Sequence, residues 1–216
     1  MSSVFINGLS GKMGIALKNL IQDEPNLEIV KTIKDSDLII DFSRPESTML
    51  IIQEAQEQKK PLIIGTTGFN ENEVKLIDEA SKNIPIVLSF NMSKGIFYFK
   101  KNIKNFLKDN LDSFECTISE THHTEKVDAP SGTAIELKKF IELNSNQNQI
   151  SSIKIESKRI LDVFGIHEVI FYNENKHISF KHEALSRNVF ADGAIFIAKS
   201  ITCKSPGIYT AQDFFK

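Results

Sequence analysis

Two adjacent histidines and a lysine stand close together in the middle of the chain and could transfer protons to a bound substrate. His122, His123 and Lys126 belong to the segment ETHHTEKVDAPSGTA, residues 120–134. Imidazole is the side chain best matched to proton transfer near neutral pH. A lysine beside it can neutralise an anionic substrate or, when buried, donate a proton itself. Histidine pairs also occur in structural and solvent-facing positions, so both interpretations are open for this pair.

The turn that follows predicts an anion-binding site beside these cations. A Pro-Ser-Gly-Thr sequence leads into a predicted helix, and the first N–H groups of a helix have no partner within it. Ser131, Gly132 and Thr133 would present those groups to an anion, and the neighbouring cations suit a carboxylate. Zinc is the rival ligand, but the two histidines have no third ligand nearby in the sequence. We expect a carboxylate pocket and no metal.

Glycines near the N-terminus have the spacing of a dinucleotide-binding loop. Gly8, Gly11 and Gly14 follow the predicted strand Val4–Asn7 and open a predicted helix. In such a loop the first glycine permits a tight turn and the second lets a pyrophosphate approach the backbone. The third lets helix and strand pack closely. The spacing alone is a weak signal, but the position between strand and helix favours cofactor binding.

The residue that would bind an adenosine ribose is not clear in the sequence. Lys31 and Lys34 could favour a 2′-phosphate and Asp35 a ribose hydroxyl, while a solvated turn explains all three equally well. The choice between NADPH and NADH is therefore open. A second loop, GTTG at residues 65–68, follows another predicted strand at the edge where open parallel sheets bind ligands, although it could also be a simple turn.

The elements predicted for the first half would position these loops at one sheet edge. Short apolar strands alternate with amphipathic helices, which is typical of a doubly wound parallel sheet. Ser43 and Glu46 predict a capping box at the start of one helix, and Asn70 and Glu73 predict another. The predicted strands are Val4–Asn7, Leu27–Ile33, Leu38–Phe42, Leu62–Ile64 and Ile86–Phe90.

The pattern changes near residues 91–95, where we expect a hinge. We predict an α/β protein with a Rossmann-like, doubly wound parallel sheet in residues 1–93, to which residues 188–216 return. Residues 94–187 would form a smaller α+β domain for substrate binding and oligomerisation. The elements predicted after the hinge are a strand over Phe114–Glu120, a helix over Thr133–Leu143, strands over Ile153–Lys158, Ile166–Tyr172 and His177–Ala184, and a helix over Val189–Ile201. We expect His167, His177 and His182 to be packing or surface residues on these strands.

Composition and charge exclude several classes of partner. A net charge of −2 provides no global field for nucleic acid or an anionic membrane surface. The apolar runs are too short to span a membrane, and nothing resembles a signal peptide. Cys116 and Cys203 are not in metal-ligand spacing and are expected to be reduced. We expect a cytoplasmic protein that acts on a small molecule.

The segment at residues 122–134 also resembles a known signature. It matches every fixed position of His-His-x-x-Lys-x-Asp-Ala-Pro-Ser-Gly-Thr-Ala, the pattern of the 4-hydroxy-tetrahydrodipicolinate reductases. The resemblance extends along nearly the whole chain. It includes the glycine loop, DFSRPE at 41–46, GTTGF at 65–69, NMSxG at 91–95, HxAxSR at 182–187 and FAxGA at 190–194.

This resemblance implies an NADPH- or NADH-dependent reductase of a cyclic dicarboxylate in lysine and diaminopimelate biosynthesis. His122 would donate and accept the proton, with Lys126 as a second acid. The residues implied in substrate binding are His123, Ser131, Gly132, Thr133 and Arg187. Those implied in cofactor binding are Gly8, Leu9, Ser10, Gly11, Lys12, Met13, Arg44, Gly65, Thr66, Thr67, Ser89, Phe90, Asn91 and Met92.

The chain is shorter than the family pattern in two places. The segment between the second and third predicted strands lacks the loop that would embrace the adenosine ribose, which bears on cofactor preference. A glycine-rich connection near residues 159–165 is abbreviated, which bears on the homotetramer that the resemblance implies. The alternatives are another Rossmann dehydrogenase, acting on an aldehyde or hydroxy acid, and a non-catalytic dinucleotide-binding protein. The complete signature favours the reductase.

Overall fold

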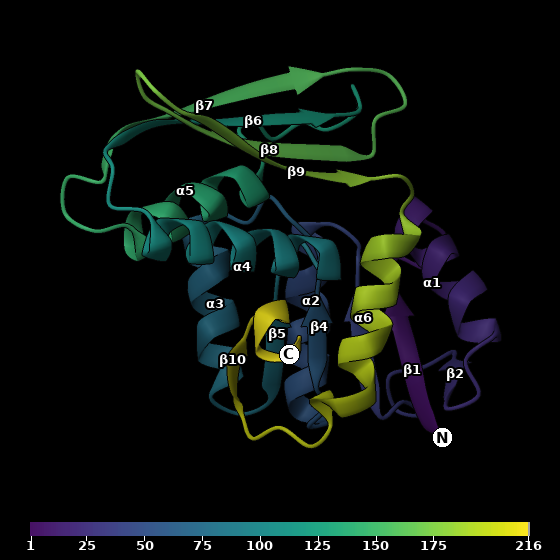
Figure 1. The fold of residues 1–216 in the computed structure, drawn as a ribbon. Helices are drawn as coiled ribbons and strands as arrows, with labels where there is room; N and C mark the ends of the chain where they lie inside the picture. The colour runs from purple at the N-terminus through teal and green to yellow at the C-terminus, as the bar shows by residue number, and fades with distance from the viewer. Residues whose placement is uncertain (216) are drawn as a thin grey trace. The chain divides into compact units, whose positions relative to one another are not determined.

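A computed structural model describes residues 1–215 and divides the chain into two compact units (Figure 1). Unit 1 combines Met1–Ser93 with the C-terminal segment that begins at Arg187, and unit 2 is Lys94–Ser186. The boundary between Ser93 and Lys94 falls where the sequence pattern changes, near residues 91–95. None of the helices in the described part of the chain has both the length and the apolar character that a membrane span needs.

Unit 1 is built on a parallel sheet with the order β10-β5-β4-β3-β1-β2. Its strands are β1 (Ser2–Asn7), β2 (Leu27–Val30), β3 (Leu38–Asp41), β4 (Leu62–Ile64), β5 (Pro85–Leu88) and β10 (Gly207–Tyr209). The central strands β3 and β4 are buried along their whole length, which explains why they read as unbroken apolar runs. The chain runs from β1 outward to β2 and then crosses back to β3, which lies on the other side of β1. The point where the strand order reverses therefore lies between β1 and β3.

Helices cover both faces of this sheet, as the sequence predicts. On one face α1 (Lys12–Gln22) packs beside α6 (Asn188–Ile201), and on the other α2 (Pro45–Glu57) packs beside α3 (Glu71–Ser81) (Figure 1). A short 3-10 turn, η1 (Ala211–Asp213), follows β10. This is the doubly wound architecture.

Unit 2 is a mixed sheet covered on one face by two helices, α4 (Lys94–Asp109) and α5 (Gly132–Asn144) (Figure 1). The strand order is β7-β6-β8-β9, with β6 parallel to β7 and the other pairs antiparallel. The strands are β6 (Phe114–His122), β7 (Ile150–Arg159), β8 (Gly165–Tyr172) and β9 (His177–Ala184). The apolar core between sheet and helices fixes the frame from which the end of β6 emerges.

Local predictions differ from the structure in a few places. The capping box at Asn70 is confirmed, with Asn70 N donating to Glu73 Oε2 over 2.7 Å. The box at Ser43 is wrong, because Ser43 Oγ donates to Asp41 Oδ1 over 2.5 Å and the N-cap of α2 is Arg44. Strand β10 was not predicted from the sequence.

Candidate active site

The glycine loop closes so tightly that side chains would not fit. Gly8 has φ +86°, and a Cβ there would lie 2.6 Å from the carbonyl oxygen of Phe42. A Cβ at Gly14 would lie 2.2 Å from the carbonyl oxygen of Gly8. The N-cap of α1 is Gly11, which has no side chain to cover the first turn of the helix. The loop therefore leaves the positive end of α1 open to an anion.

A cavity of about 470 Å³ lies beside this loop. Because its lining comes from the segments after β1 and β3, it sits at the switch point of the sheet, where doubly wound folds bind dinucleotides. The lining residues are Gly8, Ser10, Gly11, Phe42, Ser43, Arg44, Glu46 and Ser47. Arg44 is exposed and its guanidinium can pair with a phosphate. The residues present therefore fit a nicotinamide dinucleotide.

Asp41, at the end of β3, organises the cofactor loops. Its carboxylate is fully buried, and Oδ1 accepts hydrogen bonds from Asn7 Nδ2 at 2.9 Å and Ser43 N at 3.1 Å. Its Oδ2 accepts from Thr48 Oγ1 at 2.5 Å and Thr66 Oγ1 at 3.3 Å. One carboxylate thus ties together the segments after β1, β3 and β4. Sequence reasoning assigned Asp41 no role, although a carboxylate closing an apolar strand was a usable signal.

The other predicted cofactor residues also lie in segments that follow the carboxyl ends of strands in the unit 1 sheet. Gly65 lies under the ring of Phe42, since a Cβ at Gly65 would come within 2.1 Å of Phe42 Cε1. Ser89 Oγ donates to Asn91 O over 3.0 Å and shapes the turn after β5. Met92 is only 1% exposed, so it can offer a cofactor little beyond backbone atoms. Leu9 and Phe90 are exposed, Thr67 is half-buried, and Lys12 and Met13 begin α1.

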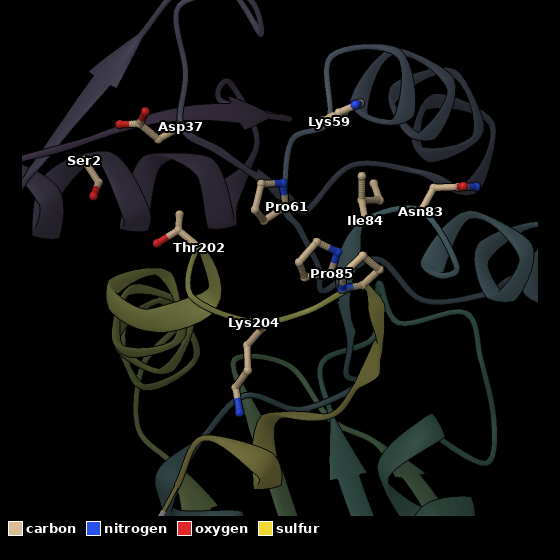
Figure 2. Close-up of a pocket in the computed structure, with 10 residues that line it drawn as sticks. Ser2, Asp37, Lys59, Pro61, Asn83, Ile84, Pro85, Thr202 and Lys204 are labelled. Carbon is tan, nitrogen blue, oxygen red and sulfur yellow. The ribbon is translucent and has the colours of Figure 1, made fainter.

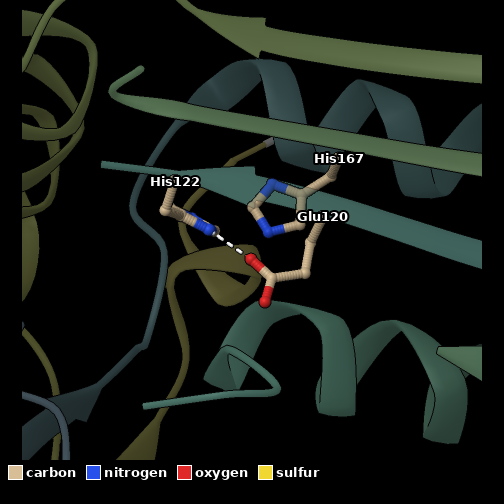
Figure 3. A group of neighbouring side chains, drawn as sticks. All are labelled: Glu120, His122 and His167. Atoms are coloured by element: carbon tan, nitrogen blue, oxygen red, sulfur yellow. Dashed lines mark hydrogen bonds and ion pairs between the residues drawn. The ribbon is translucent and has the colours of Figure 1, made fainter. Parts of the chain in front are cut away.

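The acid–base candidate in unit 2 is paired with a buried carboxylate (Figure 3). His122 is the last residue of β6, and its Nδ1 forms a short hydrogen bond with Glu120 Oε2. Residues two apart on a strand point to the same side. The other oxygen of Glu120, Oε1, accepts from Arg159 Nη1 at 3.0 Å and from Ser131 N at 3.3 Å. Sequence reasoning missed Glu120 and Arg159.

Glu120 remains ionised although it is completely buried. Burial raises the pKa of its carboxyl group, but hydrogen bonds from His122, Ser157 and Arg159 outweigh this effect and lower the pKa to about 2. The Arg159 guanidinium also balances the buried negative charge. A carboxylate with a lowered pKa therefore lies directly beside His122.

His167 lies against the same group. Its ring centroid is 5.0 Å from that of His122, and its Nε2 is 3.4 Å from Ser131 Oγ. Burial, with only 2% of the residue exposed, is the main reason that the pKa of His167 falls to about 3. His167 packs as predicted, but as a neutral neighbour of the candidate acid.

The fold brings together a group of potential metal ligands that the spacing of the histidines in the sequence does not reveal. Ligand atoms of Glu120, His122 and His167 lie within 4.8 Å of one another. Both Glu120 oxygens accept hydrogen bonds, however, and Arg159 already balances the charge. A divalent cation would add positive charge beside the guanidinium and break the His122–Glu120 bond. The arrangement therefore favours acid–base chemistry over metal binding.

The loop after His122 carries the second predicted acid. Lys126 Nζ lies 2.7 Å from Asp128 Oδ1. Arg159 fastens the loop, since its Nε donates to Lys126 O over 3.2 Å and its Nη2 donates to Asp128 O. His123 is half-buried at the start of the loop.

The predicted anion seat lies at the start of α5. Ser131 is its N-cap and accepts from Ala134 N through Oγ at 3.2 Å, while Gly132 and Thr133 form the first turn. Because Ser131 N also reaches Glu120, unit 2 brings this seat and His122 together. Arg187 belongs to unit 1, at the N-cap of α6, and its substrate role remains a prediction.

A second cavity, of about 620 Å³, lies at the other end of the strands of the unit 1 sheet, away from the cofactor loops (Figure 2). It is lined by residues at the amino ends of strands, among them Ser2, Asp37 and Pro85. None of the lining residues is predicted for catalysis or cofactor binding. Open parallel sheets bind ligands at their carboxyl ends, so this cavity is not the expected cofactor site.

Glycine loops of this geometry at a switch point are typical of oxidoreductases that use NADH or NADPH, and the comparisons place the chain in that class. The model for the N-terminus of dihydrodipicolinate reductase matches residues 29–92, and the model for its C-terminus matches residues 95–215. The chain therefore belongs to the dihydrodipicolinate reductase family, which confirms the resemblance seen in the sequence.

Full-length relatives agree with this assignment. The 4-hydroxy-tetrahydrodipicolinate reductase of Caldanaerobacter subterraneus subsp. tengcongensis is 35% identical, covering 100% of this chain and 99% of the relative. The enzyme of Rickettsia bellii is 36% identical, covering 99% and 94%. The solved structure of dipicolinate-bound dihydrodipicolinate reductase from Paenisporosarcina sp. TG-14 shares the fold, with a TM-score of 0.73, 19% identity and 97% coverage of each chain.

Proposed function

We propose that the chain reduces 4-hydroxy-tetrahydrodipicolinate to tetrahydrodipicolinate, with loss of water, in lysine and diaminopimelate biosynthesis. The observation that carries the proposal is the buried His122–Glu120 pair beside the N-terminus of α5. It places a proton donor next to a seat for carboxylates. The alternative hypothesis is a dehydrogenase that acts on a hydroxy acid or an aldehyde. Such an enzyme does not need a binding site for a dicarboxylate.

The chemistry needs an acid more than a base. Loss of water from the cyclic imine gives a conjugated ring, and a nicotinamide cofactor held by unit 1 would supply hydride to the ring carbon that lost oxygen. Electrons then move to the ring nitrogen, and the resulting enamine takes a proton at carbon. His122 delivers that proton, because an imidazolium is an effective acid near neutral pH. Lys126 neutralises the dianion and acts as the second acid.

The remaining residues bind and orient the substrate. His123, Ser131, Gly132 and Thr133 hold one carboxylate at the positive end of α5. Arg187 grips a carboxylate with two parallel hydrogen bonds. Unit 1 holds the cofactor through the loops that Asp41 organises.

The decisive experiment couples the purified protein to the enzyme that forms the substrate and follows NADH and NADPH consumption in separate reactions. Consumption that depends on the coupled substrate supports the function. Turnover only with aldehydes or hydroxy acids would assign the protein to another dehydrogenase class. The ratio of the two rates gives the cofactor preference.

We also propose a homotetramer that assembles in the cytoplasm through the face of the unit 2 sheet opposite α4 and α5. The half-buried side chains on that face of β8 are those of Ile166, Glu168, Ile170 and Tyr172. Light scattering with size-exclusion chromatography tests the assembly. Ile170→Lys should yield a smaller species, and a wild-type monomer would refute the proposal.

A further inference from the structure

We propose that Glu120 is a positioning residue that fixes the tautomer and ring orientation of His122, so that Nε2 exchanges the substrate proton. The inference rests on the proposed function, because it assumes that His122 is the proton donor. It adds a residue that neither the sequence nor the comparisons assign.

The first step concerns the atom that carries the proton. Glu120 is ionised, and an ionised carboxylate can only accept hydrogen bonds. Its partner atom, His122 Nδ1, must therefore carry a hydrogen in both the neutral and the cationic ring. The neutral ring then has its lone pair on Nε2, and the cationic ring has its transferable proton there. A carboxylate that fixes a catalytic imidazole in this way is familiar from hydrolytic triads.

The second step concerns how firmly Glu120 is held. No part of Glu120 is exposed, and Arg159 and Ser131 hold its Oε1 from a neighbouring strand and from the N-cap of α5. In the strand pairing, Glu120 stands opposite His167, and His122 stands beside Arg159. The carboxylate therefore cannot turn away from His122 without breaking bonds to three elements.

The third step concerns space around Nε2. Gly165 begins β8, and a Cβ there would lie 3.3 Å from His122 Nε2 and 3.4 Å from Cδ2. A glycine thus keeps a methyl group away from the reacting nitrogen. Glu120 is bonded to the ring and is itself paired with Arg159, while His167, which packs against the ring, is neutral.

Nuclear magnetic resonance tests the inference without any need for activity. The chain has only five histidines, so long-range ¹H–¹⁵N correlations of histidine-labelled protein can be assigned, using His122→Gln to identify the His122 signals. We expect wild-type His122 to carry its neutral-state proton on Nδ1. Glu120→Gln should shift the population towards the Nε2-protonated form. A wild-type ring protonated on Nε2 overturns the proposal, whether or not the variant folds.

Kinetics then separates positioning from a merely structural role. Glu120→Gln should lower kcat on the order of 100-fold or more, with little change in KM or in NADH affinity. Glu120→Asp keeps the charge with a shorter reach and should recover part of kcat. Glu142→Gln removes an exposed carboxylate from α5 and should leave kcat unchanged. A large rise in KM together with the fall in kcat in Glu120→Gln would contradict a positioning role.

The two proposals can fail separately. A tautomer change without a change in turnover would overturn the role of His122 as proton donor, while the Glu120–His122 pairing would stand. A protein with no reductase activity still reports the tautomer. Reductase activity combined with a tautomer that Glu120→Gln does not alter overturns the positioning role alone.

Discussion

Asn7 and Asp41 stand side by side at the ends of β1 and β3, and Asn7 Nδ2 donates to Asp41 Oδ1 over 2.9 Å. The same amide nitrogen donates to Ser47 Oγ over 2.9 Å, at the start of α2. This pair links the glycine loop to the segment that forms the other wall of the cofactor cavity. Its integrity should therefore govern cofactor affinity.

We predict that Asp41→Ala raises the Kd for NADH about tenfold or more and lowers the Tm. The substitution removes the acceptor that Asn7, Ser43, Thr48 and Thr66 share, and each buried donor that is left without a partner costs about 1–3 kcal/mol. Asp41→Asn should have a smaller effect, because the hydroxyls of Thr48 and Thr66 can rotate to accept from the new amide. Fluorescence titration and thermal unfolding measure both quantities. Equal NADH affinity in wild type and Asp41→Ala would contradict the role.

His122→Ala should lower kcat by at least about 100-fold, the usual contribution of a positioned acid, while the NADH Kd stays near the wild-type value. The reason is that His122 belongs to unit 2 and the glycine loop to unit 1. Steady-state kinetics measures kcat, and direct titration with NADH measures the Kd. A parallel loss of cofactor affinity would count against the assignment.

Lys126→Ala should lower kcat and also raise the substrate KM, because an uncompensated dianion binds less well. Lys126→Arg keeps the charge and should recover the KM more than kcat, since arginine does not deprotonate. A variant with wild-type KM and kcat would remove Lys126 from the site.

Gly165→Ala should lower kcat about tenfold or more with a modest change in Tm. The new methyl group would lie 3.3 Å from His122 Nε2, which is tighter than most contacts of a Cβ atom, so the ring must move by a few tenths of an ångström. Initial rates and the circular dichroism spectrum distinguish a displaced ring from a misfolded sheet. Full activity in this variant would show that Nε2 faces elsewhere during turnover.

The sequence predicts the doubly wound sheet well because buried parallel strands leave short apolar runs that are visible without any partner strand. Strand β10 escaped prediction because it has three residues and exists only by pairing with β5. Glu120 could have been found, since strand periodicity places it on the same side as His122. Arg159 could not, because it lies 39 residues from Glu120 and only the β6–β7 pairing brings it close.

His167 predicts how stability depends on pH. Its folded pKa of about 3 lies below the ordinary value of 6.5. Below pH 6.5 the unfolded chain binds a proton at this residue that the folded chain does not bind. The free energy of unfolding should therefore fall as the pH drops from 6.5 towards 3. Burial also lowers the pKa of His182, which acts in the same direction.

Glu120 adds to the loss of stability only at lower pH, because its folded pKa of about 2 lies below its ordinary value of 4.5. The slope of unfolding free energy between pH 6.5 and 4.5 thus belongs mainly to buried His167 and half-buried His182. We predict that His167→Gln flattens the slope of unfolding free energy against pH in this window, measured by urea denaturation. His177→Gln, which removes an exposed histidine from β9, should leave the slope as it is. Equal slopes in all three proteins would mean that His167 is protonated in the folded state.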